Sequence, residues 1–274
     1  TGGAGAGTGT TPGSGTTPTA GLTTETAQEF HVSETYTANT QTHSAVTGLP
    51  GGGYLVTWQS DDSAGNTGND GHGDIFGQMY HASGVKNGDE FQVNTYVSGE
   101  QENPSVTGLS NGGFFITWQD SSGHDGGHSW DIRGQLYDAA GATVGSETLV
   151  NTETYQEQQD PSVTALEDGG FVVAWHSRYQ DTGSSDYGVY GQRFDASGSR
   201  LGDEFLVNTY TGGSQYYPSV AAHGDGFVVT WHSYTQDASN WGVYGQRFDA
   251  AGKSLGDEFL VNTFTTEYQY QPDI

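Results

Sequence analysis

Short apolar runs that end in tryptophan recur along this chain. One of them reads Gly-Phe-Val-Val-Ala-Trp at residues 170–175, and equivalent runs end at Trp58, Trp118 and Trp231. Each is followed by a polar stretch, then by a second apolar run with a Gly-Gln pair, and then by Glu-Phe-Leu-Val-Asn or a variant. Runs of this length, separated by Gly, Asn and Asp, are typical of β-strands and are too short for helices. The pattern predicts an all-β protein.

The runs form tandem repeats of 54 to 60 residues, and each repeat holds four strand signals. The second strand signal is almost continuously apolar, so both of its faces should be covered. Four-stranded antiparallel repeats of this kind predict a small β-propeller of about four blades. An open stacked array is the alternative, because a lone strand before the repeats and a partial repeat after them do not close a ring simply. The predicted segments are a lone strand at 29–37, repeats at 41–100, 101–157, 158–214 and 215–268, and the start of a further repeat at 269–274.

Residues 1–24 differ from the repeat domain, which we place at 25–274, because they are rich in Gly, Thr and Pro and almost free of apolar side chains. Such a stretch cannot offset its ordering entropy by burial and is predicted to be a linker. No run in the chain is long and apolar enough to span a bilayer, so we expect no membrane insertion.

The formal net charge of −26 comes from 33 Asp plus Glu against seven Lys plus Arg. This charge repels nucleic acid at long range and attracts cations. The chain has no cysteine, which excludes disulfides and thiolate chemistry. Together with the Gly-, Thr- and Asn-rich composition, these properties suit an exported, secreted bacterial protein.

The polar stretches between the second and third strands of the repeats are rich in Asp and Asn. Calcium takes six to eight oxygen ligands from carboxylates, amides and carbonyls on a flexible backbone. We therefore predict bound Ca²⁺ in the first two of these loops; the alternative is a solvated acidic loop whose Asp and Gly residues only make turns. The candidate ligands are Asp61, Asp62, Asn69, Asp70, Asp74, Asp120, Asp125 and Asp131.

Aromatic residues flank the same loops. Trp130, Tyr187 and Trp241 can stack on sugar rings while nearby Asp and Asn side chains bind hydroxyl groups. We predict these three as ligand-binding residues, with a cell-surface or matrix polysaccharide as a candidate partner. The alternative is that they shield the ends of adjacent blades.

Gly-Asp-Glu recurs before the fourth strand, at 88–90, 202–204 and 256–258. Carboxylates at equivalent places in successive blades could form a ring of cation sites. The interpretation we favour is structural: the acidic pair caps the preceding turn and discourages pairing at a sheet edge.

The chain shows no nucleophile–base signature and no phosphate-binding loop. Carboxylates repeated at equivalent places argue against a single catalytic pair. An enzyme should break the repeat symmetry at one site, and the only strong departure that we find is the first loop between second and third strands. We therefore predict no catalytic residues and no enzymatic activity.

The string at 226–231, followed by 243–252, resembles repeats of large secreted bacterial RTX-type calcium-dependent adhesins and surface proteins. The resemblance covers about 29–274 and implies an extracellular setting, calcium, and adhesion or surface assembly. The tandem Gly-Gly-x-Gly-x-Asp tract of RTX proteins is missing here, so no metal-binding residue is carried over.

These lines together predict a non-enzymatic structural or adhesive module, stabilised by calcium, in cell-surface, sheath or biofilm-matrix assembly. Neighbouring copies could associate by strand addition at the orphan ends. A glycan-binding, lectin-like propeller is the alternative, and a polysaccharide-active enzyme is the third hypothesis.

Overall fold

The computed structural model describes residues 30–33, 40–61, 73–124, 129–181, 186–237, 240–264, 268–269 and 272–274. These residues form strands, turns and irregular segments, and no helix lies among them. Consequently no helix of these ranges could cross a membrane. Residues Val32–Ile274 form one compact unit that holds every strand. The predicted linker at 1–24 lies outside the described residues, and 30–33 of the predicted first strand are not in a strand.

Four antiparallel sheets of four strands each make up this unit, and within every sheet the strands follow the order of the chain. The strands are β1 (Gln41–Gly48), β2 (Tyr54–Ser60), β3 (Asp74–Tyr80) and β4 (Phe91–Gln92) in blade 1; β5 (Gln101–Gly108), β6 (Phe114–Asp120), β7 (Asp131–Tyr137) and β8 (Thr143–Leu149) in blade 2; β9 (Gln158–Ala165), β10 (Phe171–Arg178), β11 (Tyr187–Phe194) and β12 (Arg200–Leu206) in blade 3; and β13 (Gln215–His223), β14 (Gly226–Tyr234), β15 (Trp241–Phe248) and β16 (Phe259–Leu260) in blade 4.

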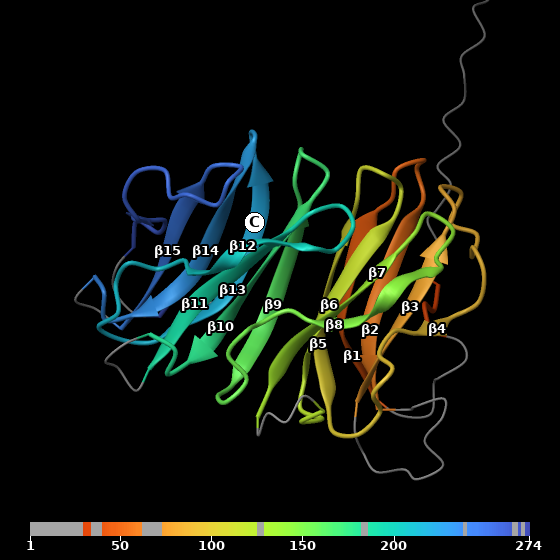
Figure 1. Ribbon diagram of the computed structural model, residues 1–274, viewed down its shortest axis with the longest axis horizontal. Helices are drawn as coiled ribbons and strands as arrows, with labels where there is room; N and C mark the ends of the chain where they lie inside the picture. The colour runs from red at the N-terminus through yellow and green to blue at the C-terminus, as the bar shows by residue number, and fades with distance from the viewer. Residues whose placement is uncertain are drawn as a thin grey trace, which may run out of the picture. The chain divides into compact units, whose positions relative to one another are not determined.

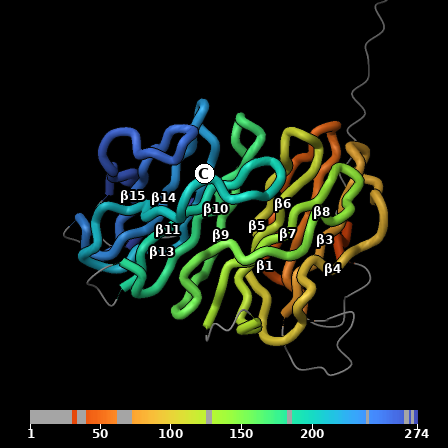
Figure 2. The backbone as a smooth tube through the Cα atoms, viewed as in Figure 1, coloured from red at the N-terminus to blue at the C-terminus, as the bar shows by residue number. Residues whose placement is uncertain are grey.

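The sheets are the blades of a four-bladed β-propeller, as the repeats predict (Figures 1 and 2). The first strands of successive blades, β1, β5, β9 and β13, lie beside one another and form the inner wall. Antiparallel pairing with short turns places the start of each inner strand next to the end of the second strand, so Gln41 pairs with Ser60. The loops between second and third strands therefore lie at the same end of the blades as the starts of the inner strands.

Three clusters of apolar side chains fill the junctions between successive blades. The second strands supply more of these side chains than any other strand, and their Trp118, Trp175 and Trp231 are fully buried. This burial on both faces explains why the second strand of each repeat is almost continuously apolar. Gly134 lies directly beneath the ring of Phe115, where a Cβ atom would stand 2.1 Å from the ring, so packing requires glycine before the repeated Gln.

Polar bonds also join successive blades. The carboxylates of Glu204 and Glu258 accept hydrogen bonds from the amides and hydroxyls of Thr152 and Thr209 in the preceding blade. Glu147 binds Thr95 in the same way. Glu204 and Glu258 of the repeated Gly-Asp-Glu therefore tie one blade to the next, a role that the structural interpretation of this motif did not include.

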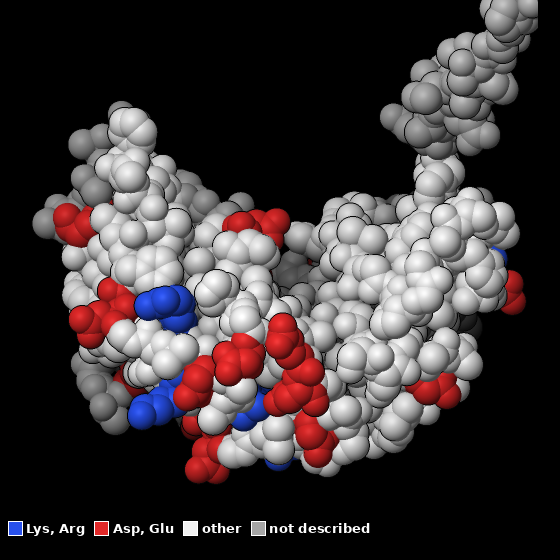
Figure 3. Space-filling model, turned by 90° about the horizontal axis from the view of Figure 1, so that it is seen from above, with Lys and Arg blue, Asp and Glu red and all other residues white. Residues whose placement is uncertain are grey.

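Blades 1 and 4 do not cover each other as successive blades do. Val46 on β1 is 67% exposed, whereas its equivalents in the other three blades, Val106, Val163 and Val220, are at most 8% exposed. The space-filling view is hollowed between the two end blades, and acidic side chains outnumber basic ones on the face shown (Figure 3). The partial fifth repeat begins against blade 4, where the Ile274 amide donates to Oγ of Ser219.

Candidate active site in the central pocket

Each inner strand carries a β-bulge at its third residue. His43, Asn103, Asp160 and Tyr217 occupy this position with φ between 50° and 52°, the left-handed region, and the strand register shifts there in every blade. Residues other than glycine seldom adopt this conformation, and proline follows in three of the four blades. Bulges of this kind re-aim side chains next to functional sites, and backbone strain gathers there.

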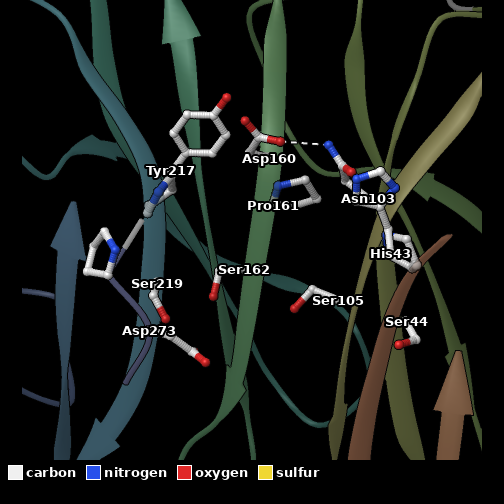
Figure 4. A pocket seen from close by; sticks show the side chains of 13 residues that line it. His43, Ser44, Asn103, Ser105, Asp160, Pro161, Ser162, Tyr217, Ser219 and Asp273 are labelled. Atoms are coloured by element: carbon white, nitrogen blue, oxygen red, sulfur yellow. Dashed lines mark hydrogen bonds between the residues drawn. The ribbon is translucent and has the colours of Figure 1, made fainter. Parts of the chain in front are cut away.

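The four bulge residues line one pocket of about 360 Å³ at the centre of the propeller. Figure 4 shows His43, Asn103, Asp160 and Tyr217 along one rim, each from a different blade, with Asp273 below Tyr217. The remaining wall is made by Pro272 and by residues that follow the four bulges: Ser44, Pro104, Ser105, Pro161, Ser162, Pro218 and Ser219.

Asp160 is the acidic member of the four bulge residues. Its side chain is 20% exposed, and Asn103 Nδ2 donates a hydrogen bond of 2.7 Å to Oδ1. Its Oδ2 lies 3.5 Å from Nδ1 of His176. Burial raises the pKa of Asp160 to about 6, because loss of water disfavours the carboxylate; the Asn103 bond and His43 oppose this rise, and Glu102 adds to it.

A network of amides connects Asp160 to Glu102 across blades 2 and 3. Gln119 accepts from the Asp160 amide at 2.9 Å and from Asn103 Nδ2 at 3.2 Å. Its own Nε2 donates to Glu102 Oε2 at 3.1 Å. Burial, and then the charge of Glu100, raise the pKa of Glu102, so a second carboxyl with a raised pKa lies one residue before the bulge of β5.

Two buried imidazoles lie at the same end of blades 3 and 4. His176 and His232 are each 3% exposed. Burial lowers the pKa of His176 to about 3, with a contribution from His232, and lowers the pKa of His232 to about 4. Both rings are therefore neutral near pH 7.

The candidate calcium ligands that the structure describes, Asp61, Asp74, Asp120 and Asp131, do not line this pocket. Asp62, Asn69, Asp70 and Asp125 lie outside the described residues. Asp61 follows β2, and its amide donates to the carbonyl of Thr40.

The other candidate ligands begin or end strands. Asp74 and Asp131 are buried and accept from Asn94 and Asn151 at 2.6 and 2.8 Å. Asp120 pairs across the strands with Asp131 and accepts from the Ser122 amide at 2.6 Å. Burial raises the pKa of Asp120. In the described part of the chain, no group of three or more His, Asp or Glu side chains gathers around one point. Calcium in these loops stays a prediction.

The structure brings two of the three predicted ligand-binding aromatics together. Tyr187 and Trp241 both contact Tyr216, with ring centroids 4.7 and 5.8 Å apart. Trp130 is the residue of blade 2 that is equivalent to Tyr187 and Trp241, and it directly precedes β7.

Sequence reasoning missed the pocket residues themselves. The signal was present: the residue before Pro-Ser is Asn103, Asp160 and Tyr217 in successive repeats, and the equivalent residue in the first repeat is His43. Asp273 likewise stands where the second, third and fourth repeats have Ser105, Ser162 and Ser219. The expected break in repeat symmetry therefore lies in the inner strands, and the first loop was not the only strong departure.

Comparison with known proteins gives no match to a family model and none to a curated protein. Solved structures do match the fold. One is a Hadza microbial sialidase, with 12% identity and a TM-score of 0.57 over 82% of this chain and 47% of that one. A second is an N-acetylgalactosamine deacetylase from F. plautii in complex with blood group B trisaccharide, with 12% identity and a TM-score of 0.50 over 87% and 74%. A thermostable family-43 glycoside hydrolase matches with 14% identity and a TM-score of 0.48 over 81% and 75%.

The sialidase and the deacetylase contradict the predicted non-enzymatic adhesive module, and with it the prediction of no enzymatic activity, because both are carbohydrate-active enzymes. The physical reason for the error is the pocket: equivalent positions carry different side chains, so the repeats do not imply equivalent chemistry. The identities are low and establish the fold alone, and this chain spans about half the length of the sialidase. Nothing in these matches indicates the RTX-type resemblance, an adhesin or a biofilm role.

Proposed function

We propose that the protein is a carbohydrate-active enzyme that cleaves glycosidic bonds in the central pocket, with Asp160 as the proton donor. One observation carries this proposal: a pocket-lining carboxyl with its pKa raised to about 6, at a position where the other blades hold His, Asn or Tyr. A general acid works best when its pKa lies near the working pH, and glycoside hydrolysis needs such a carboxyl. The carbohydrate-active neighbours support carbohydrate as the substrate class.

In this mechanism, Asp160 gives its proton to the glycosidic oxygen while the bond from that oxygen to the anomeric carbon breaks. Asp160 and Asp273 are the two carboxyl side chains among the lining residues. Asp273 accepts a proton from the water whose oxygen bonds to the anomeric carbon. The products are two free sugars, and solvent returns the two carboxyls to their starting states.

The surrounding groups hold Asp160 ready for this role. The hydrogen bond from Asn103 fixes one carboxyl oxygen, and Gln119 holds the backbone amide. Glu102 helps to keep the pKa of Asp160 high through its charge. These three are positioning residues, because they act through Asp160.

The test is hydrolysis of a panel of polysaccharides and aryl glycosides at pH 5 to 6, followed by release of reducing ends or of the aryl group. Asp160→Asn should lower kcat by about 10²–10⁴-fold, since the amide cannot donate the proton. Asp203→Asn is the matched control, because Asp203 is an exposed Asp of the same blade. Full activity of Asp160→Asn, or no turnover of any panel member by the wild type, contradicts the proposal.

A further inference from the structure

Aromatic side chains continue from the central pocket over the loop end of blades 3 and 4. The ring of Tyr187 lies 4.7 Å from that of Tyr216, which lies 5.8 Å from that of Trp241. Tyr234 follows, 4.9 Å from Trp241. We call these four residues the aromatic track.

The track is continuous with the pocket. Tyr217 lines the pocket and lies 6.2 Å from Tyr216, and its ring is 5.0 Å from that of His232. Tyr217 and Tyr234 are 40% and 41% exposed, so rings at both ends of the cluster are open to solvent. Tyr217 therefore joins the pocket that holds Asp160 to the first rings of the track.

The propeller does not need this track. Thr42 and Glu102 stand in blades 1 and 2 where blade 4 has Tyr216, and Gln59 and Gln119 stand where His232 follows the tryptophan. All four blades nevertheless keep the same four-stranded order. The aromatic residues thus serve something other than blade formation.

The chemistry of the track fits sugar rings. Aromatic faces carry negative charge density, which attracts the polarised C–H groups on the flat face of a sugar. Nearby polar groups can meet the hydroxyls: Arg178 donates to the hydroxyl of Tyr179 at 2.9 Å and lies over its ring, which presents both groups on this surface. The net charge of −26 repels anionic polymers.

We propose that the aromatic track binds the part of a neutral polysaccharide that extends beyond the reacting sugar. This inference rests on the proposed function and names its substrate class: a polymer without charge, taken up along blades 3 and 4. A small glycoside fills only the pocket.

The test measures binding without turnover. Asp160→Asn protein is run in affinity gels that contain arabinan, xylan or mannan as neutral probes and polygalacturonate as the anionic probe. We expect retardation by at least one neutral polymer and none by polygalacturonate. Adding Trp241→Ala should weaken that retardation about tenfold, and adding Tyr234→Ala should weaken it too. Tyr155→Ala, which removes a 70% exposed ring outside the track, is the control and should change it by no more than about twofold.

The outcomes separate this inference from the proposed function. If the proteins with added Trp241→Ala or Tyr234→Ala are retarded as strongly as the protein with Asp160→Asn alone, the track is overturned. This holds even if Asp160→Asn has abolished hydrolysis. Absence of retardation by every neutral polymer overturns it as well. If Asp160→Asn retains activity while both aromatic variants lose binding, the track stands and the role of Asp160 falls. Tyr234 is 41% exposed, so its variant keeps the test valid if the Trp241 variant does not fold.

Discussion

Blades 1 and 2 differ from blades 3 and 4 at the same repeat positions around the pocket. After the buried tryptophan the first pair has Gln59 and Gln119, whereas the second pair has His176 and His232. The first pair forms hydrogen bonds to Glu102, while the second packs against tyrosine and tryptophan rings. Blades 1 and 2 therefore bind a carboxyl group and shift its pKa. Blades 3 and 4 instead exclude water and present the faces of aromatic rings.

The difference between the halves can be removed by giving blades 3 and 4 the glutamine of blades 1 and 2. The pKa values of His176 and His232, about 3 and about 4, lie below the ordinary value of 6.5. Stability from these groups is present above pH 6.5 and is lost as the pH falls toward the folded values, because the unfolded chain takes up protons first.

The double variant His176→Gln/His232→Gln should therefore resist acid. Between pH 7.5 and pH 5 the wild type should lose about 4 kcal/mol of unfolding free energy relative to the variant. Urea unfolding at the two pH values measures this difference. Parallel pH profiles for the two proteins would show that the imidazoles are not held neutral.

Asp160 sits between the halves and responds to pH in the opposite direction. Its folded pKa of about 6 lies above the ordinary value of 3.8. Its contribution to stability is complete below pH 3.8 and is lost as the pH rises through about 6. Between pH 4 and pH 7.5 the unfolding free energy of Asp160→Asn should rise by about 2.5 kcal/mol relative to that of the wild type. Thermal or urea unfolding tests this, and a pH-independent difference would contradict it.

Within the polar half, blades 1 and 2 differ in how firmly the glutamine is bound. Gln119 holds Glu102, Asn103 and the Asp160 amide, whereas Gln59 reaches Glu102 at 3.5 Å. Gln119→Leu should cost about 2 kcal/mol, because buried polar groups lose their partners. Gln59→Leu is the matched variant and should cost less than about 1 kcal/mol. Equal costs in urea unfolding would remove the distinction.

The smallest expected effect comes from the bond between Asn103 and Asp160. Asn103→Gly removes the donor while the backbone keeps its left-handed φ of 52° at no steric cost. Since this bond favours the carboxylate, its loss should move the alkaline limb of the pH–rate profile upward by less than about one pH unit. Asn111→Gly, in an exposed turn of the same blade, is the control. A downward shift would contradict the assignment of Asp160 as the acid.

Much of the propeller could be predicted from the chain. The apolar runs separated by turn residues predict four strands per repeat. The recurrent tryptophans mark the junctions between blades, because a strand that is buried on both faces has the same apolar run in every repeat. The partner of the repeated Glu could not be predicted, since the bond from the Thr152 amide to the Glu204 carboxylate spans 52 residues and depends on how neighbouring blades lie.

The pocket could not be predicted for a different reason. Asp160 and Tyr217 face one cavity because each inner strand bulges at the same place, and a left-handed φ before proline has no signature in hydrophobic periodicity. The raised pKa of Asp160 likewise depends on burial beside another blade. An alignment of the repeats at the third residue of the inner strand shows that the side chain changes from blade to blade. It does not give the geometry of the pocket.

The junctions between blades have a consequence for how such a molecule can vary. Each Glu–Thr contact and each inner-strand bond, such as that from the Val220 amide to Ser162, uses two successive repeats only. A whole repeat can therefore be gained or lost without redesign of any other junction. Each gain or loss of a repeat adds or removes one bulge residue. The size and chemistry of the pocket therefore change by one repeat at a time, while the other blades keep their structure.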